Sequence, residues 1–348
     1  MRLKSKKLRF LTLMFVAVLV ISVVGCSKED KPNVDEGAAD VGSIVIKFGH
    51  NQPIASPEHV GAEKFKESVE SLDPRIKVEI YPASQLGSLR AQVEGTQMGA
   101  VNMTMQPASV ITPFVDDIKL IDLPYLLPRD SEKVFEFLDS DLAQESLDRL
   151  EEGQFKGLGY WFGGYKLFTT KDKEIHMPTD FKGLKMRTME SPLLLSQFKA
   201  WGATPIPLPY AELYTALQQG IVDGNEQPIQ TIYLNKFHEV QGNIIQSYHG
   251  TMMYVIIANK AWFDGLDETA QAAIIQAEKD GRVAERTAYA ASEADYIAKI
   301  KDSGVNFYTL TDEEIAAFKE ASKPVYEEHV TTEWQKEYIK KVQAFFEE

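Results

Sequence analysis

The sequence is poor in the residues and motifs on which metal, redox and covalent chemistry depend. Cys26 is its only cysteine, so the chain forms no disulfide bond within itself. It has no CxxC pair, no GxSxG elbow and no Walker sequence, and none of its six histidines has a second histidine four residues away. The glycines between 157 and 164 lack the GxGxxG spacing of a dinucleotide-binding loop. We therefore expect no catalytic residue, no metal and no cofactor.

Positive charge is also scarce, since the chain has a net charge of −14. Residues 1–25 hold five basic residues and no acidic one, so the chain that follows them has a net charge of −19. Such a charge argues against nucleic acid or an anionic lipid surface as the partner. It also opposes long-range attraction of an anionic ligand. Any anion site must therefore be a local and enclosed positive spot, where salt screens weakly.

The beginning of the chain has the composition of an export signal followed by a linker. Residues 1–9 are rich in basic side chains, residues 10–25 are almost all apolar, and Cys26 follows directly. This is the pattern of a secretory signal, and Cys26 resembles the lipidated cysteine of bacterial lipoproteins. We predict a lipoprotein signal peptide over 1–25 and a flexible polar tether over 26–42. The alternative is a retained membrane anchor, although the apolar run is shorter than the roughly 20 residues that span a bilayer.

Strand-like and helix-like segments alternate along the rest of the chain. Residues 43–49 and 75–81 alternate apolar and polar side chains, whereas 57–72 has apolar residues near one helical face. Later, 183–188 is typical of a strand, and 191–201 of a helix that begins with Ser-Pro and ends before a glycine. Alternating strands and helices predict an α/β fold.

The length of the chain predicts about two domains, which we expect to be two lobes. The expected lobes are 43–164 with about 251–290, and 165–250 with about 291–348. We interpret the glycines between 157 and 164 as the crossover between the lobes, leading into a strand at 165–169. Residues 266–303 contain no proline and only one interior glycine, Gly281. They form either one helix on the order of 50 Å long that crosses both lobes, or a helix that breaks near Gly281.

Residues 183–228 contain the most informative pattern of the sequence. They place Arg187 at the end of a strand and finish in a polar turn, Asp223-Gly224-Asn225-Glu226-Gln227-Pro228. A cationic strand end that faces a polar turn predicts a site for a small anion. The alternative is that Arg187 is a solvated strand arginine.

Several motifs of the chain resemble one known family. GLKMR at 183–187, GATP at 202–205, YTALQQG at 214–220 and VDGNEQP at 222–228 resemble the TRAP-transporter solute-binding proteins of the dicarboxylate-binding type. The YP…QLGS and DLPY segments at 81–88 and 122–125 do so as well. The resemblance covers nearly all of the chain after the signal. It implies a two-lobed, periplasmic-binding-protein-like (type II) α/β fold, with a long helix bracing both lobes, that closes on an organic acid.

The resemblance also implies roles for individual residues. Arg187 takes the place of the family arginine that holds the ligand carboxylate. Gln227 stands where the family has a ligand-contacting asparagine, and its extra methylene leaves the depth of the pocket open. Lys166 stands where many members have a second arginine, and it offers a point charge in place of a planar fork. The expected ligand-binding residues are Arg187, Gln227, Lys166, Glu94, His50 and Tyr165.

Each of these residues also has a structural interpretation. Lys166 would then be a surface lysine near the hinge, and Gln227 would cap the helix that follows Pro228. Glu94 would lie with Arg90 on a solvated helix face. His50 would be a structural group, and Tyr165 would pack the crossover.

The sequence thus predicts an extracytoplasmic solute-binding lipoprotein, anchored to a membrane through Cys26. It would capture a small organic acid, dicarboxylates included, and deliver it as a monomer to the membrane subunits of a TRAP transporter. A binding protein of an ABC-type transporter is the first alternative, and a pocket without the Arg187 clamp would favour it. A secreted enzyme acting on an acid is the second, and it would need an acid–base pair in the cleft.

Overall fold

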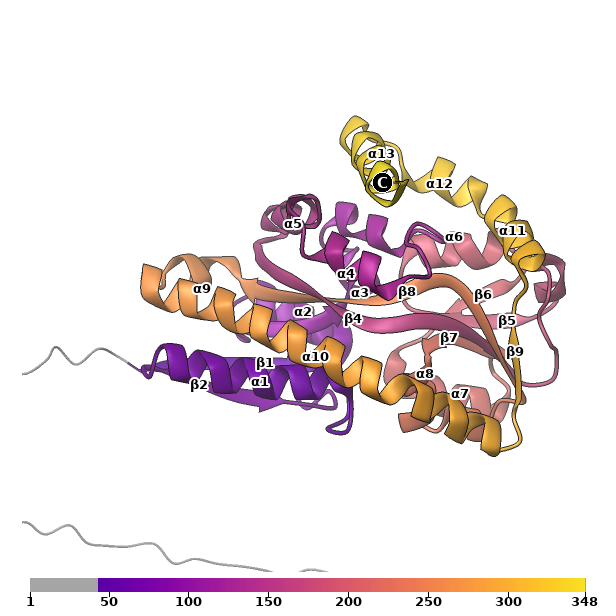
Figure 1. Ribbon diagram of the computed structural model, residues 1–348, viewed down its shortest axis with the longest axis horizontal. Coiled ribbons are helices and arrows are strands. Elements are labelled where there is room, and N and C mark those ends of the chain that lie inside the picture. The colour runs from indigo at the N-terminus through magenta and orange to yellow at the C-terminus, as the bar shows by residue number, and fades with distance from the viewer. Residues whose placement is uncertain (1–42, 348) are drawn as a thin grey trace, which may run out of the picture. The chain divides into compact units, whose positions relative to one another are not determined.

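The computed structural model describes residues 43–347 (Figure 1). The signal peptide, the lipidated Cys26 and the tether predicted over 1–42 lie outside the described residues. Within residues 43–347, no helix is both long and apolar enough to cross a membrane.

The first group of strands forms a parallel sheet, and we call the half of the protein that is built on this sheet lobe I. Strand β1 (Ile44–His50) lies between β2 (Ile76–Tyr81) and β3 (Met103–Pro107), and both pair with it in parallel. The connections contain α1 (Pro57–Leu72) and α2 (Leu89–Gln97). These elements confirm the α/β pattern predicted for this part of the sequence.

The second group of strands, lobe II, repeats this arrangement. Strand β5 (Lys185–Thr188) lies between β6 (Thr204–Pro207) and β7 (Gly224–Pro228), again in parallel. Helix α6 (Pro192–Ala200) begins as predicted, because the Ser191 side chain accepts a hydrogen bond from the Leu194 amide and Pro192 occupies the first turn. The following elements are α7 (Leu213–Gln219) and α8 (Ile229–Leu234).

Two long antiparallel strands join the lobes into one nine-stranded sheet, in the order β2-β1-β3-β8-β4-β7-β5-β6, with β9 (Asn306–Thr309) pairing β8. Strand β4 (Phe155–Thr170) and strand β8 (Asn243–Asn259) run through both groups (Figure 1). Their register is irregular between Phe162 and Leu167. The lobe boundaries predicted at 164/165 and 250/251 fall near this irregular segment and stay a prediction.

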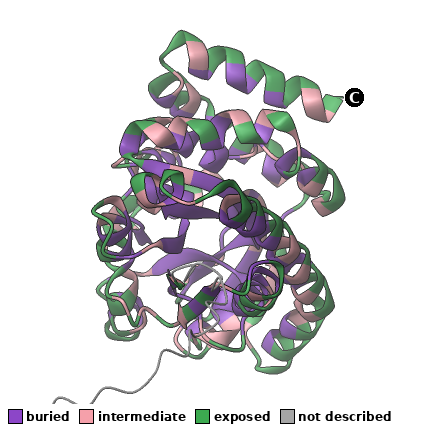
Figure 2. Ribbon diagram, turned by 90° about the vertical axis from the view of Figure 1, so that its left-hand side faces the viewer, coloured by how far each residue is buried: buried purple, intermediate pink, exposed green. Residues whose placement is uncertain are grey.

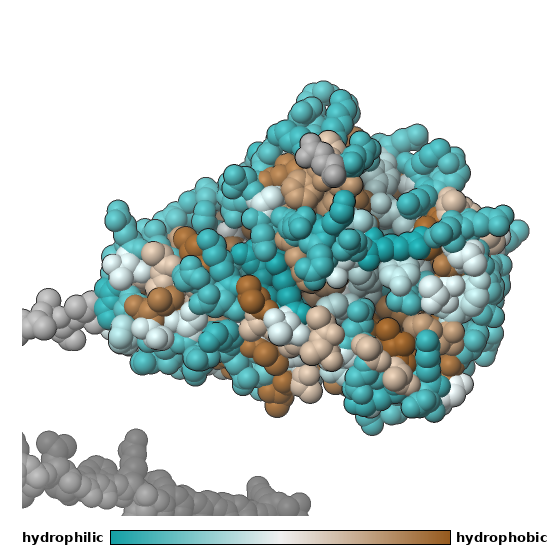
Figure 3. All heavy atoms as spheres, viewed as in Figure 1, coloured by the Kyte–Doolittle hydropathy of each residue, from teal (hydrophilic) through white to brown (hydrophobic). Residues whose placement is uncertain are grey.

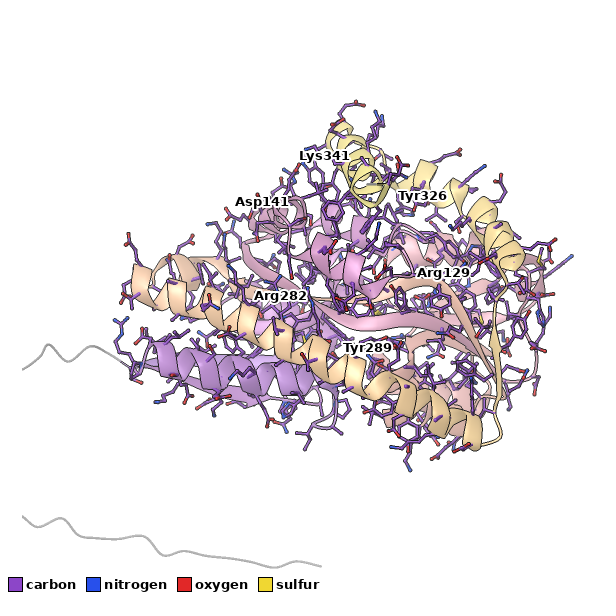
Figure 4. All side chains as sticks on the ribbon, viewed as in Figure 1. Arg129, Asp141, Arg282, Tyr289, Tyr326 and Lys341 are labelled. Atoms are coloured by element: carbon purple, nitrogen blue, oxygen red, sulfur yellow. The ribbon has the colours of Figure 1, made fainter. Side chains whose placement is uncertain are left out.

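Helix α10 (Glu268–Asp302) is unbroken over 35 residues, so the alternative of a break at Gly281 is wrong. The glycine serves a close helix crossing instead. A Cβ atom on Gly281 would lie 2.8 Å from the Gly61 carbonyl oxygen of α1 and 2.9 Å from the Trp161 ring. Helix α10 packs along α1 in lobe I and along α8 in lobe II (Figure 1). Tyr289 of α10 (Figure 4) lies edge-on to the ring of Phe162 in β4, with 5.2 Å between the two ring centroids.

The remaining helices cover the sheet and connect its strands. They are α3 (Ala108–Ile111), α4 (Ser131–Leu138), α5 (Asp141–Asp148), α9 (Lys260–Asp264), α11 (Asp312–Ala321), α12 (Lys323–His329) and α13 (Glu333–Glu347), with 3-10 turns η1 (Asp116–Asp122), η2 (Arg149–Gly153), η3 (Pro178–Phe181), η4 (Tyr210–Glu212) and η5 (Phe237–Glu239).

Helix α13 contacts lobe I, because Phe345 packs on Phe137 and the Trp334 indole donates to Glu145. The C-terminal segment, which the sequence assigned to lobe II, therefore contacts both lobes.

Buried residues gather along the central strands and on the inner faces of the helices (Figure 2). In lobe I, the core includes Phe48, Phe65 and Trp161, whose rings meet edge to face. In lobe II, Phe168 and Trp201 belong to a separate core cluster. The molecular face in Figure 3 is mostly hydrophilic, with apolar residues in small separate groups. Leu213 and Ile232 belong to a third cluster, also in lobe II. The described residues thus pack around three apolar clusters, which hold the site residues in place.

Candidate functional site

A cavity of about 430 Å³ lies between the two lobes. Lobe I contributes Ser84 of the loop after β2 and residues 87–90 at the start of α2, together with Val110 and Pro113. Lobe II contributes residues that follow the ends of β5 and β6, among them Met189 and Tyr210. Parallel neighbouring strands end at the same edge of a sheet, and that edge is where ligands bind in α/β folds. The topology thus brings distant residues together at this cavity.

Arg187 lies on the cavity wall and is almost fully buried, with 2% of its surface exposed. Its Nε and Nη2 atoms donate to the Leu208 carbonyl oxygen at 3.1 and 2.9 Å. Burial lowers the pKa of Arg187 to about 10, which leaves the guanidinium charged at neutral pH. No carboxylate of residues 43–347 forms an ion pair with it. A buried cation of this kind is stabilised by an anion that can accept its remaining N–H groups.

Tyr210 shares the cavity wall with Arg187 and was not among the residues predicted from the sequence. Its hydroxyl is buried and has no hydrogen-bond partner in the described chain. Burial raises its pKa, although the nearby Arg187 charge opposes the shift, so the phenol is neutral. The sequence carried a usable signal, because Tyr210 follows β6, the parallel neighbour of β5, and β5 contains Arg187.

Lys166 lies in β4, is not among the residues that line the cavity, and is 1% exposed. Its Nζ atom is 3.2 Å from Glu226 Oε1 and 3.8 Å from Asp122 Oδ1. Burial disfavours the charged ammonium, but the two carboxylates outweigh it and raise the pKa of Lys166. In this structure the lysine charge is therefore neutralised by the protein itself.

Glu226 is the centre of this buried network. Its second oxygen lies 2.7 Å from His249 Nε2 and accepts a 3.1 Å hydrogen bond from the Gln197 amide. Burial alone would raise the pKa of Glu226, but Lys166 and His249 lower it to about 2. Asp122 is less well compensated, and burial raises its pKa to about 6. The network joins Asp122 of lobe I to Glu226 of lobe II through the two long strands.

Gln227 and Tyr165 occupy the crossover and not the cavity wall. Gln227 is buried in β7, where it is the partner of Leu167 in β4. The Tyr165 hydroxyl donates to the Pro128 carbonyl oxygen at 2.9 Å, and its ring packs on Phe162 at 5.3 Å.

His50 and Glu94 also have partners within the protein. The buried His50 ring is hydrogen-bonded to His59 at 3.1 Å, and burial lowers the pKa of His50 to about 3. Glu94 is half exposed on α2 and forms a 2.8 Å ion pair with Arg90, which itself lies on the cavity wall. Of the six expected ligand-binding residues, Arg187 lies on the wall of this cavity, and a ligand contact for each of the six stays a prediction.

The chain is similar to known proteins both in sequence and in structure. Residues 48–333 match the family described as bacterial extracellular solute-binding protein, family 7. The chain is 36% identical over 293 residues to the C4-dicarboxylate-binding periplasmic protein DctP of Rhodobacter capsulatus, which covers 82% of this chain and 86% of that protein.

Two solved structures are similar over almost their whole length. One is a TRAP periplasmic solute-binding protein from Desulfovibrio salexigens with bound orotic acid (TM-score 0.84, 31% identity, 88% of this chain and 99% of that chain). The other is a TRAP periplasmic solute-binding protein from Sulfurospirillum deleyianum with bound succinate (TM-score 0.80, 33% identity, 88% of this chain and 100% of that chain). They confirm the predicted two-lobed fold and the predicted family resemblance. The chain belongs to the bacterial extracellular solute-binding proteins of family 7.

Proposed function

We propose that the chain is an extracytoplasmic solute-binding protein that captures a small organic acid and delivers it to the membrane subunits of a TRAP transporter. The observation that carries the proposal is Arg187, a buried cation on the wall of an interlobe cavity without a carboxylate partner in residues 43–347. The ligand carboxylate supplies the missing partner through charge-assisted bonds. Closure of the lobes removes water from this pair and strengthens it. The orotate and succinate bound to the similar structures support an acid as the ligand class.

The protein acts by binding, without covalent chemistry. The carboxylate of Glu226 and the ammonium of Lys166 are paired with each other, and neither residue lines the cavity. Membership of a solute-binding family supports the same conclusion. The family also favours TRAP delivery over an ABC-type transporter. On the pattern of the first 42 residues, we infer that a signal peptide over 1–25 is removed, that Cys26 is lipidated, and that the protein works as a membrane-anchored monomer.

A thermal-shift screen tests the ligand class. A ligand that binds the folded protein at 100 times its dissociation constant stabilises it by about 2.7 kcal/mol. We expect upward shifts of Tm with one or more mono- or dicarboxylates. A screen in which neutral sugars or cationic amines raise Tm and no acid does would overturn the proposal.

Calorimetric titration of Arg187 variants tests the carboxylate clamp. Truncation of one partner of a buried charge pair costs about 2–5 kcal/mol, or roughly 30-fold to several thousand-fold in affinity. We expect Arg187→Ala to fall in that range. Arg187→Lys should recover only part of the loss, because lysine lacks the planar two-point geometry. Arg129→Ala is the control, since Arg129 is 43% exposed and pairs with Asp312 at the surface.

A further inference from the structure

Much of the wall of the interlobe cavity is apolar. The larger apolar residues that line it come from both lobes: Leu89, Val110 and Pro113 from lobe I, and Met189, Leu208 and Pro209 from lobe II. Leu89 and Met189 are 9% and 6% exposed, so they belong to the enclosed part of the wall. Apolar surface of this kind is stabilised when an apolar part of a ligand displaces water from it.

The charged groups of the wall differ in their exposure. Arg187 is 2% exposed, and two hydrogen bonds to the Leu208 carbonyl oxygen hold its guanidinium in place. Arg90 has 53% of its side chain exposed and is already paired with Glu94 at 2.8 Å. Glu190, which also lines the cavity, is exposed and adds a negative charge. The enclosed part of the cavity therefore offers one cation, which suits an acid with one carboxylate.

Neutral polar side chains on the wall are few. In the part of the chain that the structure describes, they belong to Ser84, Ser88 and Tyr210. The Ser88 hydroxyl is exposed and already accepts a 3.2 Å hydrogen bond from the Ala91 amide at the start of α2. A sugar acid carries a hydroxyl group on almost every carbon, and a hydroxyl that is buried without a hydrogen bond costs free energy. This wall therefore suits an apolar ligand body better than a hydroxylated one.

Met189 makes the apolar wall continuous across the junction of the lobes. It follows β5 in lobe II, and its Sδ atom accepts a 3.2 Å hydrogen bond from the Ser109 hydroxyl of α3 in lobe I. Methionine is flexible and polarizable, so it adapts to irregular apolar shapes and makes favourable contacts with aromatic rings. An apolar ligand body at Met189 would thus be in contact with the place where the lobes meet.

We propose that the cavity selects monocarboxylic acids with an apolar body, aromatic or aliphatic, whose carboxylate binds Arg187. The body of the acid packs against Leu89, Val110 and Met189. This inference rests on the proposed function, because it takes the carboxylate to be held by Arg187. It sets the chain apart from proteins that bind succinate or sugar acids.

Calorimetric titration with four probes tests this preference. Hexanoate and adipate have chains of the same length, and a second carboxylate of adipate replaces the methyl group of hexanoate. 3-Phenylpropionate and D-gluconate compare an aromatic body with a hydroxylated one. We expect at least one apolar acid to bind about tenfold or more tightly than its polar counterpart, as burial of two or more methylene groups provides. The pair that shows the preference identifies the body as aliphatic or aromatic.

The outcomes of this titration separate the two proposals. A preference below tenfold in both pairs, or tighter binding of adipate and D-gluconate, overturns this inference and leaves the proposed function intact. Failure of all four acids to bind counts against the proposed function as well.

Variants of the apolar wall test the residues. Val110→Thr keeps the shape of the side chain but adds a hydroxyl group, and should weaken the preferred apolar acid roughly 3- to 10-fold without weakening its polar counterpart. Val283→Thr is the matched control, because Val283 lies on α10 and is 61% exposed, and it should change neither affinity. Met189→Gln should weaken the apolar acid about tenfold or more, and Val110→Thr serves if this variant does not fold. An unchanged ratio of the two affinities in Val110→Thr and in folded Met189→Gln overturns the assignment.

Discussion

Replacement of Lys166 by methionine separates a structural role of this lysine from a ligand-binding role. Lys166 is buried between Glu226 and Asp122, with Nζ–O distances of 3.2 and 3.8 Å. Its removal leaves two buried carboxylates without their cation. Breaking a buried ion pair in this way costs about 3–5 kcal/mol. For a protein of this size the loss corresponds to a decrease in Tm of roughly 5–8 °C.

The pH dependence of this loss follows from Glu226. Its pKa in the folded protein is lowered to about 2, below the value of 4.5 that is usual for glutamate. The pairing of Glu226 therefore stabilises the folded protein above about pH 4.5. This stability is lost as the pH falls from 4.5 through the lowered pKa of about 2. We expect the difference in unfolding free energy between Lys166→Met and the wild type to be largest near pH 7 and to shrink toward pH 3.

Ligand-free thermal and denaturant unfolding at several pH values is the appropriate assay. Lys336→Met is the control, because the Lys336–Glu333 pair is exposed and such pairs contribute about 0–1 kcal/mol. The double variant Lys166→Met, Glu226→Gln should recover part of the loss, since it removes the unpaired charge. An unchanged Tm together with lost acid binding would refute the structural role and favour the ligand contact that the family resemblance implies.

Three further predictions concern other parts of the chain. Gly281→Ala should destabilise the protein by about 1–3 kcal/mol in denaturant unfolding, despite the higher helix propensity of alanine, because its Cβ would lie 2.8 Å from the Gly61 carbonyl oxygen; a stabilised variant would contradict the close crossing. Burial raises the pKa of Glu278 from 4.5 to about 7, so stability should fall by about 3 kcal/mol as the pH rises between these values, and Glu278→Gln should remove much of that slope. The same slope in both proteins would show that Glu278 is not its source. Cys26→Ala should abolish lipid attachment, as measured by the mass of the membrane-bound protein, whereas a mature N-terminus at another residue would rule out the predicted lipidation site.

The fold was predictable wherever local periodicity and capping determine an element. Helix α1 has the predicted bounds of 57–72, and α6 begins after Ser191 as its Ser-Pro sequence indicates. The prediction at 165–169 found only the end of β4, which begins at Phe155. Almost all of β4 is buried, so it lacks the alternation of polar and apolar residues that identifies a half-exposed strand.

The place of Arg187 in the fold was predictable, and the surroundings of the other expected site residues were not. Arg187 lies near the end of β5, as its alternating strand pattern indicates. The environment of Lys166 depends on Asp122, Glu226 and His249, which come from three distant elements. Sequence spacing does not tell which of these elements lie against each other. Tyr210 was missed for a related reason, since its role depends on the pairing of β6 with β5.

A crystal structure of the protein with the acid that gives the largest shift in the thermal screen would show whether Arg187 holds the ligand. We expect a ligand carboxylate in the interlobe cavity, with two of its oxygen–nitrogen distances to the Arg187 guanidinium in the range of about 2.7–2.9 Å. A ligand that binds in the cavity with its carboxylate turned away from Arg187, or that binds outside the cavity, would contradict it.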